Sequence, residues 1–248
     1  MINLKIAIDC GHTLNGADYG AVGIKSESVL TREVGTRVIS KLKALNHTVI
    51  NCTIDTCNNL GESLAYRVNQ ANNNNVDLFV SIHFNCFNGQ GHGTEVFTWG
   101  GEQLQEATRV LNNLVGLGYA KRGIKDGSNL YVIRNTKAKA ILIECCFCDN
   151  REDMNKYDAE KMANAIVEGI TDTILPNNGN WYSLDGKVGI VTATSGLNVR
   201  EGKSTDSKIL GVFKYREKIR LYRKEGNWIH IYYGEHGGYV YADYINIL

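Results

Sequence analysis

Two histidines and a glutamate stand at the ends of short apolar runs, and these residue types are ordinary metal ligands. His12 and His83 each come at the end of such a run, and Glu144 directly follows Ala140–Ile143. A catalytic zinc site uses three protein ligands, drawn from His, carboxylate and Cys, and leaves one position for water. His12, His83 and one carboxylate would make such a set. No short-range metal motif such as H-E-x-x-H accompanies them, so histidines that end two strands by chance fit the same pattern.

The apolar runs predict the elements that position these residues. Val76–Asn85 follows an asparagine-rich turn and contains β-branched and aromatic residues, which is typical of a buried strand. Its end carries His83, and the run Leu4–Cys10 leads to His12 in the same way. In open α/β sheets, ligands bind beyond the carboxyl ends of the strands. The sequence therefore predicts one common site at that edge of a sheet.

Strands and helices alternate along the first part of the chain. Helices are predicted over Ser26–Leu45, Glu62–Asn72, Glu102–Leu117 and Arg151–Leu175, the last of which stops before Pro176. Further strands are predicted over Thr48–Cys52, Thr94–Thr98, Asn129–Ile133 and Ala140–Ile143. Such alternation indicates a layered α/β sheet.

The pattern changes after Pro176. Residues 177–186 are polar and contain glycine, as in a linker. From Lys187 to Leu248, short alternating runs are separated by turn residues and show no helical period. We expect residues 1–176 to form one domain and 187–248 to form a small all-β barrel, which removes exposed sheet edges by closing.

Composition excludes several classes of partner. The chain has 248 residues and a formal net charge of +1, which gives no signal for binding nucleic acid. No run approaches the ~18 apolar residues that span a bilayer, so we expect no membrane insertion. The start Met1–Asp9 lacks the features of a signal peptide, which predicts synthesis in the cytoplasm. The seven cysteines are odd in number and have no framework spacing, so we expect reduced thiols.

Several motifs occur in the order found in one enzyme family. They are Asp9-Cys10-Gly11-His12, Asp18–Gly23, Glu27, Ser81-Ile82-His83-Phe84-Asn85, Gly93-Thr94-Glu95-Val96 and Ile143–Asn150. Together they resemble the zinc-dependent N-acetylmuramoyl-L-alanine amidases, over residues 4 to about 175. The resemblance implies a phosphorylase/hydrolase-like mixed sheet with helices on both faces. It also implies cleavage of the amide between N-acetylmuramic acid and L-alanine in peptidoglycan.

The same resemblance implies the roles of individual residues. His12, Glu27 and His83 would bind one zinc ion per chain, and Glu144 would be catalytic. Glu33 is the alternative third ligand, although it lies nearly two turns further into the predicted helix. Near Glu144, Cys145, Cys146 and Cys148 leave open a thiolate site, but reduced cysteine is commonly a small buried hydrophobe.

The second part of the chain has its own resemblance. Thr194–Arg200, Gly226-Asn227-Trp228 and Gly238–Ile245 resemble bacterial SH3 domains. Such domains imply binding to the cell wall, here the peptidoglycan of a Gram-positive wall, with Trp228 expected in the barrel core. The two parts together resemble clostridial-type phage endolysins, and a host autolysin fits the sequence as well. Without a signal peptide, the enzyme would act on the wall after its release from the cell.

Two other functions stay open on the sequence alone. One is a zinc peptidase or amidohydrolase that cuts another amide bond of the cell wall. The other is a wall-binding protein without catalysis, against which the presence of His12, Glu27, His83 and Glu144 argues.

Overall fold

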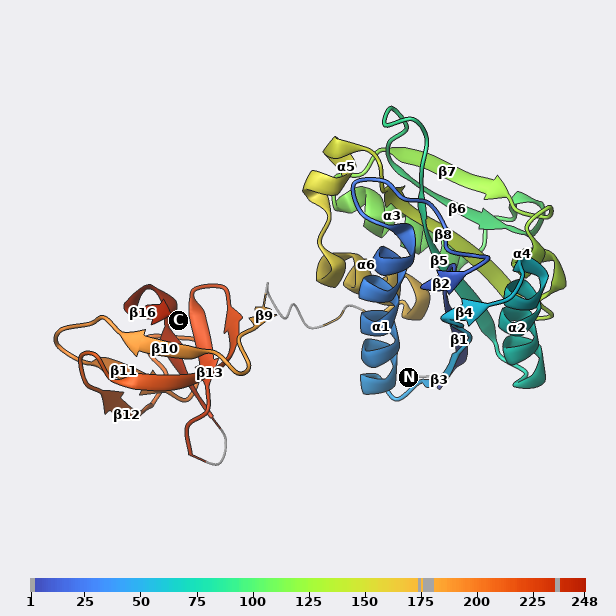
Figure 1. Ribbon diagram of the computed structural model, residues 1–248. Coiled ribbons are helices and arrows are strands. Elements are labelled where there is room, and N and C mark those ends of the chain that lie inside the picture. Colours follow the sequence, from blue (N-terminus) through green and yellow to red (C-terminus); the bar gives the residue numbers. More distant parts are fainter. Residues whose placement is uncertain (1–2, 174, 176–180, 235–236) are drawn as a thin grey trace. The chain divides into compact units, whose positions relative to one another are not determined.

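The computed structural model describes residues 3–173, 175, 181–234 and 237–248 (Figure 1). The chain divides into two compact units, residues 1–174 and 175–248. Among the described residues, no helix is both long enough and apolar enough to cross a membrane.

A six-stranded sheet forms the centre of the first unit. Its strands, in spatial order, are β3 (Thr48–Asn51), β1 (Lys5–Cys10), β5 (Leu78–Asn85), β8 (Lys139–Phe147), β6 (Thr94–Thr98) and β7 (Lys121–Asp126). The first four strands run parallel, whereas β6 is antiparallel to β8 and parallel to β7. The expected mixed sheet is therefore confirmed. Two short strands, β2 (Asn15–Gly16) and β4 (Thr56–Cys57), pair separately.

Helices cover both faces of this sheet (Figure 1). One face carries α1 (Glu27–Ala44), α3 (Gln105–Gly116) and α6 (Ala159–Thr171), and the other carries α2 (Leu60–Asn73) and α4 (Tyr131–Asn135). Between the sheet and this second pair, Val68 of α2 and Ile133 of α4 pack with Phe79 and Leu142 of the central strands. Burying such side chains contributes roughly 1.5–3 kcal/mol each, and this packing fixes the strands that carry the site.

Strand periodicity decides which polar residues share a face. Phe79 of β5 and Leu142 of β8 face α2 and α4. Because side chains alternate with a period of two, His83 and Glu144 face the same side nearer the carboxyl ends of those strands. The parallel register places them directly beside one another. The sheet thus delivers an imidazole and a carboxylate to one edge.

Two predicted elements differ from the structure, and one strand was not predicted. The run Asn129–Ile133 was expected to be a strand, but residues Tyr131–Asn135 form α4, because a short apolar run fits either element until packing selects one. The edge strand β7, with the polar sequence KRGIKD, carries no alternation signal. The predicted helix Arg151–Leu175 divides into α5 (Arg151–Lys156) and α6, since the side chain of Asp158 accepts two backbone hydrogen bonds and caps a new helix.

The second unit is an antiparallel all-β structure, consistent with an SH3-like domain. Its strands are β9 (Trp181–Ser183), β10 (Val188–Val191), β11 (Leu197–Arg200), β12 (Ile209–Phe213), β13 (Lys218–Glu225), β14 (Trp228–Ile231), β15 (Gly238–Tyr241) and β16 (Ile245–Ile247). Residues 181–183 were expected in the linker but pair with β13. Residues 177–180 of the expected linker lie outside the described residues.

The position of Trp228 differs from expectation. The buried cluster of this unit contains aliphatic residues such as Val199, Leu221 and Val240, and Trp228 lies outside it. Its partly exposed ring makes an edge-to-face contact with Tyr241, with 5.3 Å between centroids. Trp228, Tyr241 and Tyr244 line a surface groove of about 810 Å³. Trp228 lies at the surface of this unit because aliphatic side chains already fill the core.

Buried Glu225 makes the second unit sensitive to acid. Its side chain is 5% exposed and forms ion pairs with Arg223 and with Lys203, whose Nζ lies 2.6 Å away. Burial by itself would raise the pKa of Glu225, but these partners lower it below its ordinary value. The unfolded chain therefore binds the proton first on acidification. The stabilisation is present above the unfolded pKa of about 4.3 and is lost as the pH falls through the folded pKa.

We expect Glu225→Gln to flatten this acid dependence. Amide hydrogen exchange of β13 and β14 in the full chain, measured between pH 6 and pH 3, reports the local stability. In the parent chain, protection corrected for intrinsic exchange should fall over this range, and in the variant the fall should be smaller. Exposed Glu201 gives the matched control, Glu201→Gln. Equal acid loss in all three chains would contradict the assignment.

Candidate active site

Three side chains from separate elements converge at the carboxyl edge of the sheet. His12 follows β1, Glu27 is the first residue of α1, and His83 lies near the end of β5. Their candidate ligand atoms all lie within 4.8 Å of one another. Glu27 connects the two imidazoles, with His12 Nε2 3.2 Å from Oε2 and His83 Nδ1 3.1 Å from Oε1. The structure thus brings together the residues that the sequence selected as ligands.

Glycines permit this close approach. A Cβ atom on Gly11 would lie 2.3 Å from the ring of His83. Gly20 has a φ of +83° and passes so close to the His12 ring that a Cβ there would lie 2.7 Å from it. His12 itself adopts a φ of 62°, a left-handed conformation that is rare for a non-glycine residue. Such backbone strain persists only where the surroundings enforce it, and here two loops hold the imidazole in place.

Asp18 orients the imidazole of His12. Its Oδ1 lies 2.8 Å from His12 Nδ1, and its Oδ2 accepts a hydrogen bond of 2.7 Å from Ser63 Oγ. Burial by itself would raise the pKa of Asp18, but its hydrogen bonds with His12 and Ser63 hold it below the ordinary value. A carboxylate on one ring nitrogen fixes the tautomer that leaves the other nitrogen for a metal. The sequence motif contained Asp18, but only the structure shows this contact.

A buried arginine supports the loop from beneath. Arg67 of α2 is 1% exposed and pairs with Asp9, whose Oδ2 also accepts from Ser81 Oγ at 2.7 Å. Arg67 Nη2 also donates to the carbonyl oxygen of His12 at 2.6 Å. Removing one partner of a buried pair typically costs 3–5 kcal/mol. Nothing in the sequence singled out Arg67, because an arginine within a helix is usually solvated.

A second arginine acts on the same loop from the opposite side. Arg32 of α1 donates to the carbonyl oxygens of Gly11, at 2.7 Å, and His12, at 2.8 Å. It also pairs with Asp55 at 3.0 Å. The backbone on both sides of the His12 ring is therefore held by charged hydrogen bonds.

The site is arranged to hold positive charge. Burial alone would lower the pKa of His12, but hydrogen bonds with Asp18 and Glu27 raise it to about 10. Burial alone would raise the pKa of Glu27, yet its contacts with His12 and His83 keep it well below the ordinary value. Two carboxylates thus face one imidazole, and a proton or a metal ion satisfies them. Two histidines and a glutamate are a donor set that zinc accepts in catalytic sites.

Glu144 lies beside this cluster with an unengaged oxygen. The strand register pairs it with His83, and its Oε2 is buried without a hydrogen-bond partner among the residues that the structure describes. Burial raises its pKa to about 7, opposed by His83 and reinforced by Glu27 and Glu95. Since buried polar atoms are nearly always bonded, this orphan oxygen indicates a place for an absent group such as a reacting water.

Neither the alternative third ligand nor the thiolate site that the sequence left open is supported by the structure. Glu33 accepts a hydrogen bond of 2.6 Å from Tyr157 Oη and lies 3.7 Å from Lys25, outside the group of converging ligand atoms. All seven cysteines are free thiols. Burial raises the pKa of Cys148 to about 12 and holds that of Cys145 well above its ordinary value, so these thiols are not the reactive thiolates that catalysis needs.

Comparison with known proteins identifies the family of the chain. The family model for N-acetylmuramoyl-L-alanine amidases matches residues 6–175, and that for bacterial SH3 domains matches residues 195–246. An uncharacterized protein of Clostridium perfringens is 33% identical over 234 residues, which cover 88% of this chain and 68% of that protein. The endolysin of Bacillus phage SPP1 is 30% identical over 177 residues, which cover 67% of this chain and 63% of that endolysin.

Solved structures lead to the same family. The catalytic domain of the CD27L endolysin, which targets Clostridia Difficile, superposes with a TM-score of 0.65 at 29% identity. The match covers 70% of this chain and 100% of that domain. The chain therefore belongs to the N-acetylmuramoyl-L-alanine amidases, a family of peptidoglycan hydrolases, and carries a bacterial SH3 domain after its amidase part.

Proposed function

We propose that this amidase is zinc-dependent and that His12, Glu27 and His83 hold the metal. The observation that carries the proposal is the convergence of three ligand atoms from separate elements within 4.8 Å. Asp18 behind His12 gives the carboxylate–histidine arrangement that commonly supports a zinc ligand. With three protein ligands, one position is left for water, as in catalytic zinc sites.

The bound metal would polarise the lactyl carbonyl and lower the pKa of the attacking water. Glu144 accepts a proton from that water on its buried Oε2 as the water oxygen bonds to the carbonyl carbon. When the carbon–nitrogen bond breaks, Glu144 returns the proton to the departing alanine nitrogen, so a neutral amine leaves. His12 and His83 stay fixed through these steps because Asp18 and the strand β5 hold them.

Removal of the metal tests the ligand set. Purified protein should contain about one zinc per chain, and chelation should abolish release of alanine amino groups from cell walls. Added zinc should restore the activity. The measurement combines metal analysis with an assay of new amino termini on soluble wall fragments. Full activity in excess chelator would contradict zinc dependence, and new amino termini other than alanine would identify a different amide bond.

Substitutions separate the metal ligand from the base. Glu144→Gln should retain zinc and lose about 10²–10⁴-fold in kcat, the usual contribution of general acid–base catalysis. His83→Ala should lose zinc as well as activity. Glu33→Gln is the matched control, since Glu33 lies outside the cluster, and it should keep both. A Glu144→Gln enzyme within a few-fold of the parent would remove Glu144 from the mechanism.

We further propose that the SH3 unit attaches the enzyme to the peptidoglycan of a Gram-positive wall. The groove lined by Trp228, Tyr241 and Tyr244 offers aromatic faces together with the carboxylate of Asp243. A second attachment point raises the effective concentration of the catalytic unit at an insoluble substrate.

Dividing the chain tests this attachment. Residues 1–174 contain all four proposed site residues and should cut soluble muropeptide at a rate similar to that of the full chain. They should lyse intact cells more slowly, because one of two attachment points is lost. The full chain with Trp228→Ala should lyse intact cells as slowly as residues 1–174 alone. Pelleting with purified walls measures binding directly. Full pelleting and full lysis by both variants would contradict the targeting role.

A further inference from the structure

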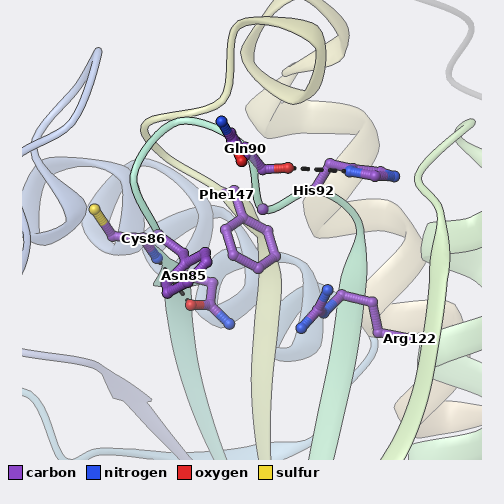
Figure 2. A pocket seen from close by; sticks show the side chains of 8 residues that line it. Asn85, Cys86, Gln90, His92, Arg122 and Phe147 are labelled. Atoms are coloured by element: carbon purple, nitrogen blue, oxygen red, sulfur yellow. Dashed lines mark hydrogen bonds between the residues drawn. The ribbon is translucent and has the colours of Figure 1, made fainter.

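A pocket of about 510 Å³ opens beside the proposed catalytic residues (Figure 2). It lies beyond the ends of β5 and β8, two residues after His83 on one strand and three residues after Glu144 on the other. Its lining includes Asn85, Phe87, Gln90, His92, Arg122 and Phe147. Because it adjoins the reaction centre, any group bound in it belongs to the part of the substrate next to the scissile bond.

Arg122 is held rigidly at the wall of this pocket. Its Nε donates to Glu95 Oε2 at 3.0 Å, and its guanidinium carbon lies 4.9 Å from the centroid of the Phe147 ring. The side chain is still 40% exposed. Among the described residues, its two terminal nitrogens have no hydrogen-bond partner, and Figure 2 shows the guanidinium group directed toward the pocket. A guanidinium group that is oriented, and whose terminal nitrogens have no partner, can bind a planar anion such as a carboxylate.

Glu95 serves to position this arginine. It is buried, and its Oε1 accepts a hydrogen bond of 2.9 Å from Asn85 Nδ2 while Oε2 pairs with Arg122. Both oxygens are therefore occupied. The antiparallel register sets Glu95 directly opposite Glu144, and paired residues in such a ladder have Cα atoms about 4.5–5.5 Å apart. Arg122 thus stands one side chain away from the proposed base.

The charge of the pocket lining indicates which part of the substrate binds in the pocket. The solvent-facing side chains of the lining that can carry positive charge are those of Arg122 and His92, and the exposed Cys86 carries a thiol. Glu95 is buried and paired with Arg122. In peptidoglycan the amino sugars of the glycan are uncharged wherever the lactyl carboxyl group is in amide linkage to a peptide. The peptide, in contrast, carries free carboxylates. Its second residue is a glutamate joined onward through its side chain, so its α-carboxyl group is free in some walls and a carboxamide in others.

We propose that this pocket receives the residue that follows alanine in the peptide, and that Arg122 binds its free α-carboxylate. The inference rests on the amidase function and extends it to substrate selection. A bidentate pair between guanidinium and carboxylate is stronger than a hydrogen bond to a neutral carboxamide, which offers one acceptor and no charge. Arg122 is then a specificity-determining residue, and Glu95 and Asn85 are positioning residues.

Two soluble muropeptides that differ only in this carboxylate or carboxamide test the proposal. The parent enzyme should favour the carboxylate by about 10-fold in kcat/KM, which corresponds to about 1.4 kcal/mol. The difference should lie mainly in KM, because the contact is made in the bound substrate as well as in the transition state. Arg122→Gln should cut both substrates with nearly equal kcat/KM, and Arg122→Lys should retain part of the preference.

Matched controls separate this effect from a loss of charge or fold. Lys125→Gln removes an exposed cation from the same strand and should preserve the parent's preference. Comparison of two substrates on the unaltered parent needs no variant, so a folding defect cannot hide the result. Turnover without discrimination by the parent, or discrimination that survives Arg122→Gln, would overturn the subsite alone. Absence of turnover on both substrates would overturn the amidase function and the subsite with it.

Discussion

The carboxylate of Glu27 joins three separate parts of the amidase unit. One oxygen lies 3.1 Å from His83 Nδ1 and accepts from the backbone nitrogen of Phe84 at 3.0 Å. The other lies 3.2 Å from His12 Nε2 and accepts from the backbone nitrogen of Ala21 at 3.1 Å. The loop after β1, the start of α1 and the end of β5 therefore meet at one buried charge. A buried carboxylate is costly unless it is paired and hydrogen-bonded, so the site geometry and the local fold are stabilised by the same contacts.

Glu27 is one of several carboxylates at the site, and the groups around them carry or attract positive charge. Asp18 and Asp9 add two more carboxylates, and Arg67 forms ion pairs with both of them. Zinc would complete a site in which histidine nitrogens and a glutamate oxygen already face one another. Glu144 then stands apart with an orphan oxygen, which suits a group that exchanges a proton rather than one that binds the metal permanently. The proposed division between ligand and base therefore rests on which carboxylate oxygens already have partners.

Outside the proposed metal ligands, too, the partners of a carboxylate indicate its role. Glu95 is another carboxylate close to the reaction centre, yet its two oxygens are taken by Asn85 and Arg122. It acts on the substrate through the arginine that it holds. In the second unit, aliphatic side chains fill the core, which leaves aromatic rings such as Trp228 to form a surface groove. Both units therefore present recognition surfaces assembled around a core that other residues complete.

Much of the fold follows from local pattern. The buried strands β1, β5 and β8 could be predicted because their apolar runs are short and contain β-branched residues. Their polar ends placed His12, His83 and Glu144 at one edge, and the family motifs indicated Glu27. The edge strand β7 was not predicted because a polar strand with one neighbour carries no pattern. The type of α4 was predicted wrongly because the short apolar run Leu130–Ile133 fits a strand or a helix.

The contacts between distant residues could not be predicted from the sequence. Arg67 is separated from Asp9 by 58 residues, and Arg122 from Glu95 by 27; no spacing rule connects such pairs. The sequence by itself determined which chemical groups are available and which strands carry them, because periodicity and residue type are local properties. Tertiary structure alone decided which carboxylate binds, which orients and which remains free, because that depends on the hydrogen-bond partners that packing brings to each oxygen.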